Sequence, residues 1–151
     1  MASIINADTS DGLKITSDTS GQIDLQSAGS TKATIDTSGN LKFDSGYGSV
    51  ATAYGCRAWV NFNGTGTVAI RESKNVSSIT DNGTGDYTVN FTTAMVDANY
   101  CSTGSAGLST VNPSNGSFAS FPVDTSSCRC EIFTTTNVKT DFAGVFVAIF
   151  R

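Results

Sequence analysis

Residues 58–91 read AWVNFNGTGTVAIRESKNVSSITDNGTGDYTVNF, and this stretch decides the fold class. It holds three short apolar runs: Ala58–Phe62, Thr67–Ile70 and Tyr87–Phe91. Apolar and polar residues alternate in the first and third runs, and a period of two is the period of a strand. The turns between the runs contain Asn63-Gly64 and Asn82-Gly83, and Asn-Gly favours type I′ hairpins because it tolerates positive φ at both central positions. We therefore predict an antiparallel β-meander here.

The composition of the whole chain also favours strands. Ser, Thr, Asn and Gly are abundant among the 151 residues, whereas the helix formers Glu, Leu and Gln are scarce. The net charge is −4 and the basic residues are scattered, so we expect no nucleic-acid partner. No apolar run approaches the roughly 20 residues of a membrane helix, and the N-terminus lacks the features of a secretory signal. We therefore expect that the protein is made in a cytoplasm and that it does not insert into a membrane.

Four cysteines, in a protein made in a cytoplasm, are expected to stay reduced. They are Cys56, Cys101, Cys128 and Cys130. Cys128 and Cys130 are two residues apart, so in a strand they point to the same face. Their spacing does not match a zinc site, and the chain has no His. We predict buried thiols that act as small apolar side chains, with a disulfide as the alternative.

The N-terminal region, residues 1–49, contains a weak repeat of apolar pairs that straddle one polar residue. The pairs are Leu13–Ile15, Ile23–Leu25, Ala33–Ile35 and Leu41–Phe43. Their spacing suits short strands joined by tight turns. Two apolar side chains per strand cannot offset an ordering entropy of about 1–2 kcal/mol per residue, so the arm must bury them against something else. We predict an intertwined or prism-like trimer, with a partly disordered tail as the alternative. The predicted interface residues here are Leu13, Ile15, Ile23, Leu25, Ile35, Leu41 and Phe43.

The C-terminal region, residues 50–151, is predicted to form an antiparallel β-sandwich or jelly-roll-like head. After the meander we expect strands at Asn99–Thr103, Phe118–Val123, Cys128–Thr134 and Phe142–Phe150, with a long loop from Gly104 to Gly116. The last strand is apolar on both faces, so it is either a central strand or is covered by a partner subunit. The second alternative adds Val145, Val147 and Ile149 to the predicted trimer interface.

We expect no catalytic activity. The chain lacks His, which is the commonest general base and the usual partner of a Ser or Cys nucleophile. Glu72 and Glu131 are its only glutamates, and no pair of carboxylates lies in apolar surroundings that would separate two pKa values. The Asp-containing turns do not match a calcium loop. The sequence therefore predicts no catalytic residue, no metal and no cofactor.

A sugar-binding surface is the sharper hypothesis for a site. Such surfaces combine exposed aromatic rings with polar loop residues, and long loops in compact domains are often functional. The candidates are Trp59, Tyr100, Asn112, Asn115 and Phe118, four of which lie in or beside the predicted loop. The competing interpretation places the aromatic residues in the core. A trimer interface explains Trp59 equally well.

Two segments, WVNFNGTG at 59–66 and NVSSITDNGTGDYTVNFT at 75–92, resemble a domain that recurs in bacteriophage virion proteins. These are tail-fibre, head-fibre and decoration proteins. The resemblance implies a structural or adhesive component of the virion, assembled in the bacterial cytoplasm. It implies as partners further copies of the chain, other virion proteins and, for an exposed head, a host-surface glycan.

Together these observations predict an all-β, trimeric tail-fibre protein. The arm would attach to the virion and trimerise, and the head would be exposed for host recognition. The first alternative is a capsid decoration or head-fibre protein. A second is a polysaccharide-degrading tailspike, which the missing acid/base pair disfavours.

Overall fold

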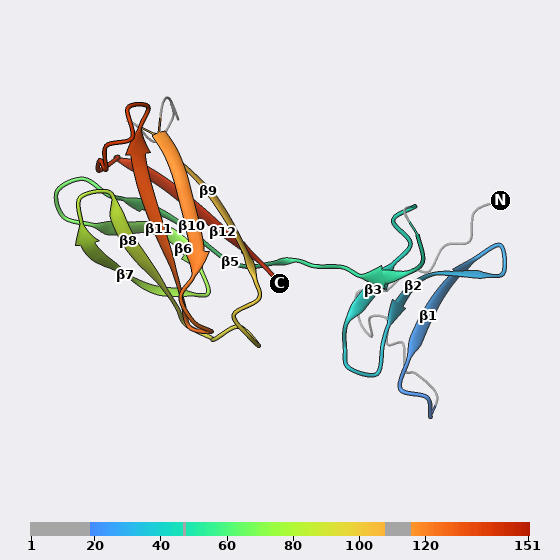
Figure 1. The fold of residues 1–151 in the computed structure, drawn as a ribbon. Helices are drawn as coiled ribbons and strands as arrows, with labels where there is room; N and C mark the ends of the chain where they lie inside the picture. Colours follow the sequence, from blue (N-terminus) through green and yellow to red (C-terminus); the bar gives the residue numbers. More distant parts are fainter. Residues whose placement is uncertain (1–18, 47, 108–115) are drawn as a thin grey trace, which may run out of the picture. The chain divides into compact units, whose positions relative to one another are not determined.

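A computed structural model describes residues 19–46, 48–107 and 116–151, and all regular structure in these ranges is β-strand. The strands form three antiparallel sheets of four strands each (Figure 1). The chain divides into two compact units, Met1–Ala53 and Tyr54–Arg151. In the ranges that are described, no helix long and apolar enough to span a bilayer occurs. The protein is therefore all-β.

The first unit contains one sheet, in which the strands follow each other in sequence order. Its strands are β1 (Ile23–Ser27), β2 (Ser30–Ile35), β3 (Leu41–Phe43) and β4 (Ala51–Thr52). Three of the predicted apolar pairs lie in β1, β2 and β3, and the pair Leu13–Ile15 lies outside the described residues. The β1–β2 turn has positive φ at both Ala28 (51°) and Gly29 (76°), which is the requirement of a type I′ hairpin. The tight hairpin therefore occurs where no Asn-Gly pair marks it.

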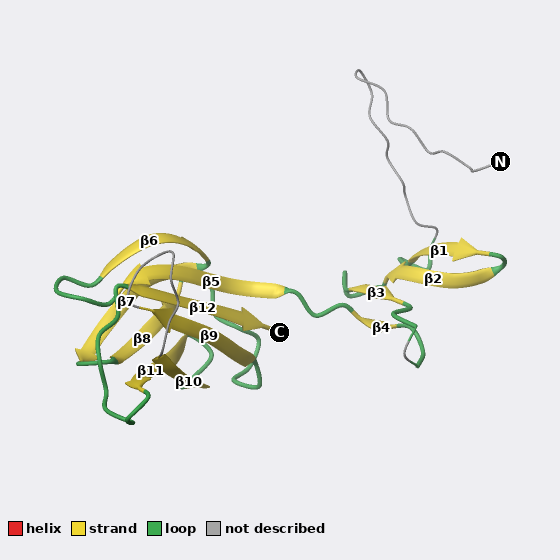
Figure 2. Ribbon diagram, turned by 90° about the horizontal axis from the view of Figure 1, so that it is seen from above, coloured by secondary structure: helices red, strands yellow, loops and turns green. Residues whose placement is uncertain are grey.

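The second unit is a two-layer arrangement of eight strands. They are β5 (Cys56–Asn63), β6 (Ala69–Lys74), β7 (Val76–Gly83), β8 (Asp86–Phe91), β9 (Cys101–Gly107), β10 (Gly116–Pro122), β11 (Ser127–Thr134) and β12 (Gly144–Phe150). One sheet has the order β6-β5-β12-β9 and the other has the order β10-β11-β8-β7. Figure 2 shows these sheets as facing layers, with a common core between them. We call this unit the sandwich.

The predicted meander over residues 58–91 is wrong, because the stretch forms two hairpins in different sheets. β5 pairs with β6 in one sheet, and β7 pairs with β8 in the other. Asn75, between β6 and β7, has a φ of 56°, and its Nδ2 donates to the carbonyls of Arg57 (3.2 Å) and Thr93 (3.0 Å). Its Oδ1 accepts the Thr93 amide at 2.7 Å. These bonds hold the chain where it leaves one sheet for the other.

The predicted turn type is also wrong at both Asn-Gly pairs. Neither Asn63 nor Asn82 has positive φ; among the nearby turn glycines, Gly66 (62°), Gly83 (125°) and Gly85 (64°) do. Strand β9 extends to Gly107, so the predicted loop begins later than Gly104. Strand β7 was not predicted, because its mostly polar sequence lacks a regular apolar alternation.

The core is closed by alternate residues of both sheets. Strand β12 is a central strand between β5 and β9, as one of the two alternatives predicted. Val145, Val147 and Ile149 are at most 3% exposed, so these three side chains pack inside this unit. Their predicted place in a trimer interface is therefore wrong. Cys128 and Cys130 are both fully buried, which confirms the prediction of buried thiols for these two. Cys56 and Cys101 are exposed, so the same prediction is wrong for them. Burial raises the pKa of the Cys128 thiol to about 11.

One end of the sandwich is closed around Tyr87. Its hydroxyl oxygen lies 2.6 Å from Asp141 Oδ1 and 2.8 Å from the Gly64 carbonyl oxygen. The Gly85 amide donates to the same carboxylate oxygen at 2.7 Å. Burial raises the pKa of Tyr87 above its ordinary range, with a further contribution from Asp141, so the phenol stays protonated as a donor. Tyr87 therefore links the turn at Gly64 to the segment at Asp141, and Asp141 in turn binds the turn at Gly85.

The two Asn-Gly-Thr-Gly motifs each supply one glycine to this end. A Cβ at Gly64 would lie 2.7 Å from Tyr87 Oη, and one at Gly85 would lie 2.6 Å from the carbonyl oxygen of Ile132. Both distances are shorter than real Cβ contacts allow. The motifs are therefore explained by close packing, because a larger residue at either position would push the sandwich end apart.

Candidate functional site

The candidate site lies on the outer face of the sheet β6-β5-β12-β9, away from the core. In the register of the sheet, Ala148 of β12 is opposite Trp59 of β5 and Thr103 of β9. Two residues along, Phe146 is opposite Asn61 and Ser105. Successive residues of a strand alternate between faces, so these six side chains share the outer face while Val60 and Val147 enter the core.

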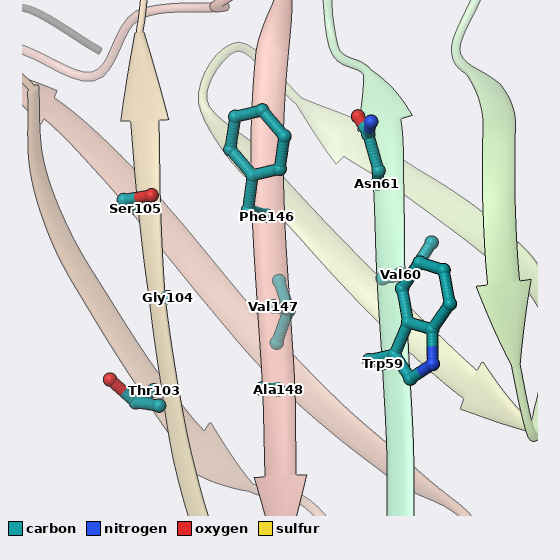
Figure 3. A pocket seen from close by; sticks show the side chains of 9 residues that line it. All are labelled: Trp59, Val60, Asn61, Thr103, Gly104, Ser105, Phe146, Val147 and Ala148. Atoms are coloured by element: carbon teal, nitrogen blue, oxygen red, sulfur yellow. The ribbon is translucent and has the colours of Figure 1, made fainter. Parts of the chain in front are cut away.

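A shallow groove of about 370 Å³ runs over this face (Figure 3). The residues that line it are Trp59, Val60, Asn61, Thr103, Gly104, Ser105, Phe146, Val147 and Ala148, and we call it the Trp59 groove. Trp59 and Phe146 supply two aromatic rings from neighbouring strands. They occupy diagonal positions, for which the separation is about 7–8 Å between backbones. The small Ala148 side chain beside Trp59 leaves the space between the rings open.

The polar groups of the groove point outward and are uncharged. Arg71 Nη1 donates to Asn61 Oδ1 at 3.3 Å, and Arg71 Nη2 donates to the Ala143 carbonyl at 2.6 Å. Arg71 therefore holds the Asn61 side chain through its amide oxygen and leaves Nδ2 unbonded. Within the described part of the chain, Asn61 Nδ2, Trp59 Nε1 and the hydroxyls of Thr103 and Ser105 have no intramolecular hydrogen-bond partner. They are available to a ligand.

The outer face of the other sheet differs, because its charged groups bind one another. Asp86, only 5% exposed, accepts hydrogen bonds from Arg129 Nε and Lys139 Nζ, both at 2.7 Å. Lys139 Nζ also lies 2.9 Å from Glu131 Oε1. The hydrogen bonds from Arg129 and, to a smaller extent, Lys139 hold the pKa of Asp86 below its usual range. These carboxylates are ion-paired.

A catalytic or metal-binding arrangement is not visible in the ranges that the structure covers. Glu72 lies on β6 and Glu131 on β11, so the only two glutamates belong to different sheets. A general acid needs a raised pKa, whereas Asp86 has a lowered one. No group of three or more acidic, Cys or His side chains suited to a metal occurs among the described residues.

Of the five predicted binding residues, the structure places only Trp59 on the groove. Tyr100 is 5% exposed; its hydroxyl donates to the Ser127 carbonyl and its ring packs edge-on against Phe91. Phe118 is partly buried against the core, close to Gly104, where a Cβ would lie 2.5 Å from its Cζ. Asn112 and Asn115 lie outside the described residues. The prediction of a binding role for Tyr100 and Phe118 is therefore wrong, and the competing interpretation, which places both in the core, is confirmed.

Sequence reasoning missed the other groove residues. A usable signal existed in β12: every second residue of this doubly apolar strand faces outward, so Phe146 and Ala148 mark a second apolar face. The contribution of β9 was hidden, because Thr103 and Ser105 were assigned to the end of a strand and to a loop. Their strand pairing places them beside Phe146 and Ala148.

The predicted interface residues of the N-terminal unit share one face of its sheet. The register aligns Ile23, Ile35 and Leu41 in one row, and Leu25, Ala33, Phe43 and Ala51 in the next. Leu25, Ile35, Leu41 and Phe43 are 45–54% exposed. Leu13 and Ile15 lie outside the described residues. The opposite face is polar, with Thr34 Oγ1 donating to Asp24 Oδ1 at 2.7 Å and Lys42 paired with Asp36 at 2.9 Å.

A scan against family models and searches of curated proteins and of solved structures found no match to this chain. The arguments for its function therefore rest on its own residues and geometry.

Proposed function

We propose that this chain is a fibre-type structural protein of a phage virion. Its N-terminal sheet associates with the same sheet of two further copies and anchors the trimer to other virion proteins. The sandwich forms the exposed head. The observation that carries this proposal is the uncovered apolar face of the N-terminal sheet, and the sequence resemblance to virion fibre proteins supports it.

A single-layer sheet with one apolar face does not stand alone in water. Stable domains bury such a face against a second layer. In the N-terminal unit, Thr34 is the only buried residue among those described, and the apolar side chains Leu25, Ile35, Leu41 and Phe43 stay about half exposed. Three copies around an axis would cover three equivalent faces in a prism. The polar faces, with their ion pairs, would then meet solvent.

The second and third copies are the occupants to which the proposal commits. The two rows of this face consist of aliphatic and aromatic side chains, so they match another copy of themselves without unpaired charges. The charged residues Lys32, Asp44, Asp36 and Lys42 are already paired within the sheet. No charged group has to be desolvated when the apolar faces meet.

Native mass spectrometry of the full chain tests the trimer. We expect a mass three times that of the 15.6 kDa chain. The double substitution Leu41→Ser/Phe43→Ser removes two apolar side chains from the face and should give a monomer. Lys42→Ser lies between them on the opposite face of the same strand and should remain a trimer. A monomeric wild-type chain, or a trimer that survives the double substitution, would overturn the assignment.

Binding assays distinguish a tail fibre from a capsid decoration protein. A fibre head should bind cells of the host, whereas a decoration protein should bind expanded capsids and leave cells unlabelled. Purified full-length protein carrying a fluorescent label serves for both assays.

A further inference from the structure

We propose that the Trp59 groove binds a neutral saccharide through the faces of Trp59 and Phe146. The binding itself stands on the geometry of the groove, and only its role in host recognition rests on the proposed function. The ligand class follows from three features: two half-buried aromatic rings, hydroxyl and amide groups without an intramolecular partner beside them, and the absence of charge in the lining.

The aromatic rings suit the apolar face of a pyranose. Trp59 and Phe146 are both half-buried, so each ring is supported from below and still presents a surface to solvent. A partly solvent-exposed aromatic side chain is well suited to a ligand that is apolar on its faces and polar on its edges. The groove of about 370 Å³ falls at the small end of ligand pockets, a size appropriate to one or two sugar rings.

The polar fringe suits sugar hydroxyls, which both donate and accept hydrogen bonds. Asn61 Nδ2 is a donor held in place by the bond from Arg71 to Asn61 Oδ1. The hydroxyls of Thr103 and Ser105, on the other side of β12, can donate or accept. Because Arg71 orients the amide before a ligand arrives, less ordering entropy is lost on binding.

The surroundings of the groove favour a neutral ligand over an acidic one. None of the nine lining residues is ionisable. On the adjacent strand β6, Lys74 pairs in register with Trp59, and Glu72 pairs with Asn61. Arg71, which binds Asn61 Oδ1, is a second cation at this border, so Glu72 balances one of two positive charges. The lining itself carries no charge that would pair with a sialylated or phosphorylated sugar.

A second copy of the chain fits this face less well than a saccharide. Covering the groove with another protein surface would leave Asn61 Nδ2 and the Thr103 and Ser105 hydroxyls without water, and each unpaired polar group is costly to bury. The face is thus built for a small polar ligand.

Titration of the full chain with cellotetraose, maltotetraose, chitotetraose and mannotetraose tests the proposal, with sialyllactose as the acidic comparison. Trp59 is the only tryptophan, so its fluorescence reports on the groove directly. We expect at least one neutral saccharide to shift the emission in a saturable way. If none does at millimolar concentration, or if sialyllactose binds most tightly, the proposal fails.

Matched variants then locate the binding site by calorimetry. Phe146→Ala should weaken the affinity about fivefold or more, because it removes one stacking surface. Phe121→Ala removes an aromatic side chain that is 42% exposed on the other sheet and should leave the affinity unchanged. An unchanged affinity in Phe146→Ala would overturn the assignment. The variant Leu41→Ser/Phe43→Ser should bind the saccharide with the same affinity per chain, which separates failure of the trimer from failure of the groove.

Discussion

The N-terminal sheet and the sandwich are made from the same local pattern and reach opposite outcomes. Both alternate apolar and polar residues along short antiparallel strands. In the sandwich two sheets face each other, and large side chains such as Phe62, Tyr87 and Ile132 are completely buried. In the N-terminal sheet the corresponding apolar side chains stay about half exposed, as Leu41 (53%) and Phe43 (45%) show. Alternation therefore creates an apolar face, and only a second layer turns that face into a core.

The two units also differ in whether their turn glycines leave room for a side chain. Turn glycines of the N-terminal sheet, such as Gly29 and Gly39, would meet nothing within 4 Å if they carried a Cβ. In the sandwich, the turn glycines Gly64 and Gly85 and the strand residue Gly104 would meet atoms at 2.4–2.7 Å, whereas the turn glycine Gly66 would meet nothing within 4 Å. A closed core constrains its turns as well as its strands, because the connections pack against it.

The largest effect is expected at Gly85, where steric overlap adds to an unfavourable backbone conformation. Gly85→Ala should lower the free energy of unfolding by about 3 kcal/mol or more, or prevent folding, because the φ of 64° and a contact at 2.6 Å both resist a Cβ. Gly66→Ala is the matched control: its φ is 62° and nothing lies within 4 Å, so about 1–2 kcal/mol is expected. Urea unfolding followed by Trp59 fluorescence compares them. Equal losses would mean that packing at Gly85 contributes nothing.

The second-largest effect is expected from core substitutions, which test whether the two units are stabilised independently. Ile132→Ala creates a cavity among fully buried side chains and should destabilise the sandwich by about 2–5 kcal/mol. Leu41→Ala removes a half-exposed side chain from the other unit, so the unfolding transition reported by Trp59 should not move. A shift of that transition in Leu41→Ala would show that the N-terminal sheet contributes to the stability of the sandwich.

Acid should weaken the sandwich through Asp86. Hydrogen bonds from Arg129 lower the folded-state pKa of Asp86 below the unfolded value of about 3.9, so its contribution is complete above that pH. It is lost as the pH falls toward the folded-state value. We expect the melting temperature of wild type to fall more between pH 6 and pH 2.5 than that of Asp86→Asn.

A matched variant in the other unit serves as the control for this pH experiment. The pKa of Asp36 is also lowered, chiefly by the hydrogen bond from Lys42, but this pair lies in the N-terminal sheet. Asp36→Asn should therefore leave the acid-dependent fall of the Trp59 transition as in wild type. If Asp86→Asn loses as much stability in acid as wild type does, another carboxylate is responsible.

The smallest effect is chemical and reports on how tightly the sandwich core is closed. Cys56 and Cys101 are exposed, whereas Cys128 and Cys130 are buried and burial raises the pKa of both thiols. A thiol reagent such as Ellman's reagent should modify two thiols rapidly at pH 8 in the native protein and four in guanidinium. In Cys56→Ser/Cys101→Ser no rapid reaction should remain. Rapid modification of a third thiol in wild type would show that the core opens readily.

The sequence was sufficient for properties that depend on neighbouring residues. Alternation at Ala58–Phe62 and Tyr87–Phe91 correctly predicted strands, because side chains two apart share a face in any extended chain. The same rule placed Cys128 and Cys130 on one face, which the structure shows to be the core side. For Gly144–Phe150 it left two alternatives, a central strand or a subunit interface, and the structure shows the central strand. The chemistry of Asn and Gly located turns at residues 63–66 and 82–85, although it did not set their type.

The tertiary structure alone decided which strands pair and what each face meets. A strand does not encode its partner locally, so the chain could cross between sheets at Asn75 and join β5 to β12 across most of the sandwich sequence. Packing between the two sheets placed Tyr100 in the core and Phe118 against it. Pairing of β12 with β5 and β9 brought Trp59, Phe146, Thr103 and Ser105 onto one groove from three strands. The sequence by itself determined where most of the strands form, and long-range packing decided which of their faces became a core and which stayed on the surface.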